Sequence, residues 1–149
     1  MDYVLRKATL TDASRIEELF LEMLQAIYHT DAAEGYQSGY LDKFFSGGED
    51  RICVAESPDG VIGFLSMEVH RDEGFLYLDD FSVAEGCRNR GVGTGLIRAA
   101  EAYAAEHGIG KVVLHVERAN QGARRLYLRL GYRVDADEGG RVRMGKSVG

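Results

Sequence analysis

The residues with the clearest chemical meaning form one glycine-rich stretch, Arg88-Asn89-Arg90-Gly91-Val92-Gly93-Thr94-Gly95. Its three glycines stand at alternate positions and carry no Cβ, so successive backbone N–H groups can turn toward one anion. The stretch lies between a strand-like run, 75–83, and a helix-like run, 96–107, and a helix start adds the positive end of its dipole. Two arginines supply whole charges. The stretch therefore predicts a phosphate-binding turn.

Two common nucleotide-binding patterns do not fit this stretch. The dinucleotide fingerprint G-x-G-x-x-G fails because, counted from Gly91, its third glycine falls on Leu96. The P-loop pattern fails because no lysine followed by Ser or Thr comes after the glycines. The pattern that remains is Arg88-x-x-Gly91-x-Gly93, and a turn that binds nothing is the alternative when the motif is taken alone.

Charge is divided unevenly along the chain. Residues 1–75 contain 6 Lys and Arg against 15 Asp and Glu, a net charge of −9, whereas residues 76–149 contain 12 against 9, a net charge of +3. The phosphate-binding turn belongs to the basic half. This division predicts a cationic substrate next to an anionic cofactor and argues against nucleic acid as a partner, although solvated surface charge explains any single residue equally well.

Hydrophobic spacing predicts the elements that position these residues. Thr11 or Asp12 is expected to cap a long first helix, and Asn120 a short helix that ends at Gly131. Further helices are expected at 40–45 and 96–107, and strands at 3–8, 51–56, 61–70, 75–83, 111–117, 132–134 and 141–148. This order predicts an α/β fold, one domain over residues 1–149 with a mixed sheet and helices on both faces.

Composition sets further limits on the kind of protein. The chain has 149 residues, 45% of them hydrophobic, which suits one compact domain. No apolar run reaches the roughly 20 residues of a membrane span, and the first residues lack the regions of a signal peptide, so a cytoplasmic protein without a membrane partner is expected. Cys53, Cys87 and the four histidines lack metal-ligand spacing, so we expect free thiols and no metal.

The motifs together resemble the GNAT superfamily of N-acetyltransferases over most of the chain. Besides Arg88-x-x-Gly91-x-Gly93, the resemblance rests on 76–83, on Met144-x-Lys146, and on a block containing Leu114-x-Val116, Asn120, Ala123, Leu126-Tyr127 and Gly131-Tyr132. Residues 77–83 are locally similar to diamine (spermidine/spermine) acetyltransferases. The resemblance implies a mostly antiparallel sheet of six to seven strands and transfer of acetyl from acetyl-CoA to an amine by direct attack.

Acetyl transfer to an amine needs a neutral amine, support for an oxyanion and a proton for the departing thiol. An alkyl amine with a pKa of about 10.4 is protonated at pH 7, so a proton acceptor is useful, and Asp79 is the first candidate. Strand alternation points Asp79 and Asp80 to opposite faces, so only one of them can face the acceptor. A solvated or hydrogen-bonded strand carboxylate is the alternative for both residues, and for Asp80 it is the preferred interpretation.

The resemblance implies the remaining roles. The backbone N–H of Phe81 would meet the oxyanion, the main chain of Val83 would pair with the pantetheine arm, and the hydroxyl of Tyr127 would protonate the sulfur. Coenzyme A would also contact Asn120 and the glycine-rich stretch, that is Arg88, Asn89, Arg90, Gly91, Val92, Gly93, Thr94 and Gly95. The alternative is a core tyrosine for Tyr127 and a helix cap for Asn120.

The acceptor is expected to be a small molecule with a primary amine and a second positive charge. Asp79 and Asp80 suit two ammonium groups, and the acidic, aromatic segment 28–45 has the composition of a lid over a cation, with Tyr28 and Tyr36 as acceptor-binding residues. A pair of helices with core aromatics is the alternative. A catalytically silent acyl-CoA-binding module and a protein or peptide N-acetyltransferase also remain open, as does a homodimer.

Overall fold

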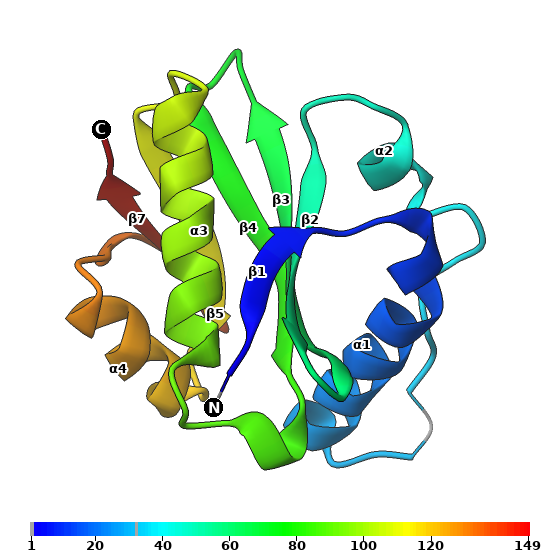
Figure 1. The fold of residues 1–149 in the computed structure, drawn as a ribbon. Coiled ribbons are helices and arrows are strands. Elements are labelled where there is room, and N and C mark those ends of the chain that lie inside the picture. Colours follow the sequence, from blue (N-terminus) through cyan, green and yellow to red (C-terminus); the bar gives the residue numbers. More distant parts are fainter. Residues whose placement is uncertain (1, 32) are drawn as a thin grey trace. The chain divides into compact units, whose positions relative to one another are not determined.

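The computed structural model describes residues 2–31 and 33–149, and the chain divides into two compact units. Unit 1 contains the chain up to Met67 together with Asp80–Ala100, and unit 2 contains Glu68–Asp79 and Glu101–Gly149. Seven strands are hydrogen-bonded in the order β1-β2-β3-β4-β5-β7-β6 (Figure 1). Strands β3 (Gly60–His70) and β4 (Phe75–Val83) each contribute residues to both units.

Unit 1 begins with β1 (Val4–Lys7), a short 3-10 turn η1 (Leu10–Asp12) and the long helix α1 (Ala13–Tyr28). After the short helix α2 (Asp42–Phe45), β2 (Arg51–Ser57) and β3 form an antiparallel hairpin, and β1 pairs antiparallel with β2. Buried apolar side chains from these elements form one cluster: Ala8, Ile16, Leu19, Leu41, Phe44, Ile52, Val54, Val61 and Phe64. The predicted strand 51–56, its turn and its partner strand are confirmed.

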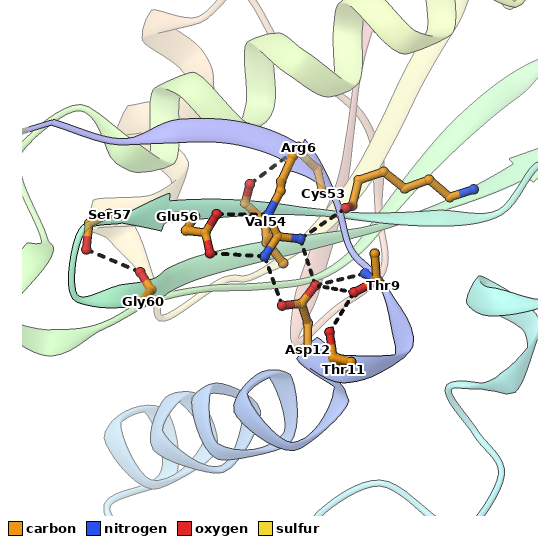
Figure 2. Close-up of polar contacts among 10 residues, drawn as sticks. Arg6, Thr9, Thr11, Asp12, Cys53, Val54, Glu56, Ser57 and Gly60 are labelled. Carbon is orange, nitrogen blue, oxygen red and sulfur yellow. Dashed lines mark hydrogen bonds and ion pairs between the residues drawn. The ribbon is translucent and has the colours of Figure 1, made fainter.

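A network of charged side chains fixes the N-terminal end of α1. Figure 2 shows the guanidinium of Arg6 between two carboxylates: its two terminal nitrogens donate to Asp12 at 2.8 and 3.0 Å, and its Nε donates to Glu56 at 3.1 Å. Asp12 also accepts the backbone N–H of Thr9 at 2.8 Å. The hydrogen bonds from Arg6 hold the pKa of Asp12 below its usual value. Asp12 occupies the N-cap position of α1, as expected, but its side chain makes no hydrogen bond to the helix, because Arg6 and Thr9 use that carboxylate.

Unit 2 is built on the parallel pairing of β4 with β5 (Lys111–Glu117). Strand β7 (Arg141–Ser147) pairs antiparallel with β5 along its whole length and with β6 (Arg133–Asp137), where a bulge interrupts the register between Val134 and Ala136. Helix α4 (Gln121–Arg129) connects β5 to β6. The predicted strands at 75–83 and 111–117 and the closing hairpin are confirmed.

The helix after the glycine-rich stretch begins earlier than predicted. A 3-10 turn η2 (Glu85–Cys87) follows β4, and α3 then runs over Val92–Glu106 instead of 96–107. Glycine is unfavourable inside a helix, which is why the pattern at 91–95 resembles a loop, but the first turn of a helix tolerates it better. In the part of the chain that the structure describes, no helix is both long and apolar enough to span a membrane.

Candidate active site

The predicted site residues fall in both units. Unit 1 contains the glycine-rich stretch, Phe81, Val83, Asp80 and the tyrosines of the segment 28–45. Unit 2 contains Asp79, Asn120 and Tyr127.

The glycine-rich stretch ends in a helix start whose first N–H groups have no acceptor within the helix. The backbone at Asn89 (φ 61°) and Gly91 (φ 85°) is left-handed, a conformation that glycine adopts without strain. The first helical hydrogen bond of α3 runs from the N–H of Gly95 to the carbonyl of Gly91 at 2.9 Å. The N–H groups of Val92, Gly93 and Thr94 precede this bond and have no acceptor within the helix. A phosphate group fits this helix start.

Two of the glycines are also required by packing. A Cβ at Gly93 would lie 2.9 Å from the ring tip of Phe81 on β4, and a Cβ at Gly95 would lie 2.7 Å from the hydroxyl of Tyr3. That hydroxyl also donates to the carbonyl of Gly91 at 3.2 Å. Gly93 therefore lets the start of α3 approach Phe81 of β4 closely, and Gly95 lets it approach Tyr3, functions that the sequence pattern did not reveal.

The two arginines of the stretch differ in their surroundings. Arg88 donates through Nε to the carbonyl of Val83 at 3.0 Å, and its terminal nitrogen lies 3.7 Å from Glu22 of α1. Arg88 thus ties the turn to the end of β4 and has part of its charge balanced by Glu22. Arg90 is exposed to solvent. Arg90 is therefore the arginine whose charge is more available to an anion.

The backbone N–H groups along β4 alternate between the edge that faces β3 and the opposite edge. The N–H of Asp80 bonds to the hydroxyl of Ser66 on β3 at 2.9 Å, and the N–H of Ala84 bonds to the carbonyl of Ile62 on β3 at 2.7 Å. Successive N–H groups of a strand point to opposite edges, so the N–H of Phe81 points away from β3. Pairing with β5 covers Leu76–Leu78 and ends before Phe81. This orientation suits the predicted role of the Phe81 N–H as an oxyanion donor.

Asp80 is held by a tyrosine of the predicted lid segment. The hydroxyl of Tyr36 donates to the carboxylate of Asp80 at 2.8 Å. The ring of Tyr36 is stacked between Phe20 and Tyr40, with centroid distances of 3.9 and 4.8 Å. Both faces of that ring are therefore covered, and Tyr36 cannot hold an acceptor cation by a ring face. Its hydroxyl remains as the group that orients Asp80.

Other residues of the lid segment are arranged differently from the expectation. The ammonium of Lys43 lies 5.5 Å from the ring centre of Tyr40 and 5.0 Å from that of Phe44. These rings therefore already make cation–π contacts with a side chain of this protein. Tyr28 is the last residue of α1 and is 59% exposed. In unit 2, Asp79 is exposed. The structure brings Tyr36 to Asp80 but leaves Tyr28 at the surface.

Helix α4 fixes the position of Tyr127 in unit 2. Asn120 caps the helix as predicted, its side-chain oxygen accepting the N–H of Ala123 at 3.2 Å. At the other end Gly131 (φ 99°) closes a Schellman motif, in which the N–H of Tyr132 bonds to the carbonyl of Tyr127 at 3.0 Å. Burial raises the pKa of the Tyr127 hydroxyl, so the phenol keeps its proton at neutral pH.

A buried network behind Tyr127 was not expected from the sequence. The ring of Tyr132 packs edge-on against that of Tyr127 at 5.9 Å, and its hydroxyl donates to Glu101 at 2.8 Å. Lys146 donates to both oxygens of Glu101 at 3.1 Å. The network fixes Tyr132, and Tyr132 in turn fixes the ring of Tyr127. Its members are distant in sequence, and only the Gly131-Tyr132 pair after the helix gave a signal.

A cavity within unit 1 lies away from the predicted site residues. A cavity of about 770 Å³ is lined by Thr11, Arg15, Glu56, Cys87 and their neighbours, and none of the predicted site residues contributes to it. Within residues 2–31 and 33–149 no group of three or more His, Cys, Asp or Glu side chains is arranged to hold a metal ion.

Comparison with known proteins decides the family. The model of the Acetyltransferase (GNAT) family matches residues 16–132. The chain belongs to this family. An uncharacterized N-acetyltransferase of Methanocaldococcus jannaschii is 30% identical over 131 residues, which are 87% of this chain and 78% of that protein.

Two further relatives extend the comparison of this GNAT protein. Streptothricin acetyltransferase of Streptomyces lavendulae is 36% identical over 89 residues, 57% of this chain and 47% of the relative. The crystal structure of PaiA N-acetyltransferase from Thermoplasma acidophilum in complex with coenzyme A aligns with a TM-score of 0.81, 19% identity and 99% coverage of both chains. The predicted fold class, a mixed and mostly antiparallel sheet, and the predicted enzyme class, an N-acetyltransferase, are confirmed.

Proposed function

We propose that this GNAT protein transfers acetyl from acetyl-CoA directly to a primary amine of a small acceptor that carries at least one further positive charge. The observation that supports this acceptor class most is the carboxylate of Asp80, oriented by Tyr36 and adjacent in sequence to the exposed Asp79. A carboxylate held in this way by a tyrosine hydroxyl suits an ammonium group of the acceptor. The net charge of −9 over residues 1–75 favours the approach of such a cation.

The glycine-rich stretch is the part of the chain that would hold the cofactor. The N–H groups of Val92, Gly93 and Thr94 would bind its pyrophosphate, and Arg90 would add a whole charge. The family model's match over residues 16–132 runs through both units, which supports one acetyltransferase domain over residues 1–149. Bound acetyl-CoA supplies the acetyl group as a thioester.

The remaining groups of the chain would act on charge and protons. The N–H of Phe81 would stabilise the negative charge that develops on the carbonyl oxygen. The hydroxyl of Tyr127 would give its proton to the departing sulfur. A thiol with a pKa of about 8.5 leaves fairly well unaided, so this acid contributes a factor of roughly 10² to 10⁴ rather than the whole rate enhancement. Asp79 would hold the attacking amine.

A thiol-release assay with acetyl-CoA tests the proposal. The acceptors are diamines and polyamines, aminoglycosides, basic peptides, a neutral-tailed monoamine and amino acids. We expect kcat/KM to be highest for small multi-amines. Replacing both Asp79 and Asp80 by Asn should raise KM for a diamine at least about 10-fold more than for the monoamine. The reason is that each charged contact to the acceptor contributes roughly 1.4 kcal/mol or more. Asp72→Asn, in the exposed turn before β4, is the control and should change neither KM.

The outcomes separate the acceptor classes. Highest activity on neutral or acidic amines would contradict the charge argument while leaving the acetyltransferase activity intact. Highest activity on peptides would assign the protein to the peptide N-acetyltransferases instead. Binding of acetyl-CoA without thiol release on any amine would indicate a silent acyl-CoA-binding module.

A further inference from the structure

A hydroxyl, an imidazole and a carboxylate form a chain of hydrogen bonds within unit 2. The hydroxyl of Tyr77 on β4 is 2.7 Å from Nδ1 of His115 on β5. Nε2 of His115 is 3.2 Å from the carboxylate of Glu138, in the turn between β6 and β7. The His115 side chain is only 17% exposed. No role was assigned to these residues from the sequence.

The sheet register explains why the three side chains meet. Tyr77 pairs with Val113 in the parallel ladder, so the side chains of Tyr77 and Val113 share a face, and His115 follows two residues later on that same face. Arg143 stands opposite His115 in the β5–β7 ladder. The turn after β6 brings Glu138 to the imidazole, and Arg141 donates to its carboxylate at 3.0 Å. The hydrogen bond from His115, and then that from Arg141, lower the pKa of Glu138.

The partners fix the tautomer of the imidazole. An ionised carboxylate only accepts hydrogen bonds, so Nε2 of His115 carries the hydrogen and donates it to Glu138. In the neutral ring Nδ1 is then an acceptor and takes the O–H of Tyr77. If Nδ1 gains a proton, it donates to the Tyr77 oxygen instead, and both hydrogen bonds persist. The imidazole can therefore take up and release a proton without losing either contact.

Tyr77 lies next to the predicted acceptor carboxylate along β4. Tyr77 and Asp79 are two residues apart on an extended strand, so their side chains leave the same face about 6.6 Å from each other. An ammonium group held by Asp79 would thus be within reach of the Tyr77 hydroxyl, directly or through one water. His70, which packs edge-on against the Tyr77 ring at 6.1 Å, pairs instead with Glu73.

We propose that Tyr77, His115 and Glu138 form a proton relay that removes the proton from the acceptor ammonium before it attacks; this inference rests on the proposed function. One N–H bond of the ammonium breaks, and its proton passes to the oxygen of Tyr77. The Tyr77 O–H proton passes at the same time to Nδ1 of His115. The nitrogen keeps the electron pair for attack, and the imidazolium, paired with Glu138, later returns the proton to water.

General chemistry favours the imidazole over Asp79 as the proton acceptor. A neutral imidazole is a general base, and Nδ1 of His115 already lies 2.7 Å from the Tyr77 hydroxyl, whereas the charge of Asp79 is needed to hold the acceptor cation. The two roles therefore divide: Asp79 holds the positive charge, and the relay takes the proton. Tyr77 is the member that touches the substrate, and His115 and Glu138 act through it.

The test is the pH dependence of kcat with one diamine acceptor, whose own ionisation is common to every variant. The wild type should show an ascending limb, because the relay accepts a proton only while the imidazole of His115 is neutral. His115→Gln and Tyr77→Phe should lose this limb and lower kcat at pH 7 at least about 10-fold. Glu138→Gln should move the limb to lower pH, because the imidazolium loses its carboxylate.

Two controls make the result specific. Asp137→Asn changes the carboxylate adjacent to Glu138, which pairs with Arg118, and should leave the limb unchanged. Asp79→Asn should raise KM and keep the limb. Tyr77→Phe retains the ring, so it remains informative if His115→Gln does not fold.

The outcomes distinguish this inference from the proposed function. Tyr77→Phe with a wild-type limb and a kcat within about twofold of the wild type would overturn the relay while the acetyltransferase assignment stood. A wild type that transfers acetyl to no amine would contradict the proposed function and the relay with it, before any variant is compared.

Discussion

At the scale of single residues, the most informative side chain is Tyr127. Its hydroxyl is buried and its pKa is raised by that burial, so it remains protonated over the pH range in which the enzyme would work. The backbone carbonyl of Tyr127 accepts the Tyr132 N–H in the Schellman motif, and its ring packs in a T-shaped contact with the Tyr132 ring. These contacts involve the ring and backbone of Tyr127, so its hydroxyl can be removed without disturbing them.

Tyr127→Phe should therefore leave the affinity for coenzyme A within about twofold and lower kcat about 10-fold or more, since only the proton donor is lost. Steady-state kinetics between pH 6 and 9 and calorimetry with coenzyme A measure the two quantities. Leu128→Ala, next along α4 and 42% exposed, is the control for the helix and should keep kcat. Unchanged turnover in Tyr127→Phe would make Tyr127 a core residue only.

At the scale of elements, the junction of β4 with α3 has two functions. Its helix start leaves the N–H groups of Val92, Gly93 and Thr94 without acceptors in the helix, and Gly93 lets Phe81 pack against the same turn. A side chain at position 93 would push against the Phe81 ring, and a carboxylate there would also repel a phosphate.

Gly93→Asp should abolish the binding of coenzyme A, and Gly93→Ala should weaken it at least about 10-fold, because a displacement of the helix start misaligns the donors. Gly86→Ala is the matched control, since a Cβ there meets nothing within 4 Å, and it should change the dissociation constant less than about twofold. Calorimetry gives all three constants. Normal binding by Gly93→Asp would show that the phosphate site lies elsewhere.

Local patterns predicted the elements well where neighbouring residues determine them. The β4 bounds, 75–83, follow from alternation between two turns, and the Asn120 cap and the Gly131 stop are local hydrogen-bond motifs. The start of α3 was misplaced because glycines that permit close packing resemble a loop. Asp12 is the N-cap residue of α1, but the sequence did not show that its carboxylate binds Arg6 of β1 instead of the helix N–H groups.

At the scale of the whole molecule, the sequence predicted the family and the mixed sheet, because several separated motifs agree with one another. It could not reveal contacts that depend on strand register. His115 meets Tyr77 and Glu138, which are 38 and 23 residues away, and Tyr132 meets Glu101 31 residues away. Likewise, the aromatic segment 28–45 was expected to hold a foreign cation, whereas its rings stack on one another and on Lys43.

The proposed reaction is the direct transfer of acetyl from acetyl-CoA to an amine. Mass spectrometry of the protein and the acceptor in one reaction tests it most directly. With acetyl-CoA alone the mass of the protein should stay unchanged. With a diamine added, free coenzyme A and mono-N-acetylated diamine should appear in equal amounts. Acetyl attached to the protein, for example on the partly exposed thiol of Cys87, or thiol release without an acetylated amine, would contradict direct transfer.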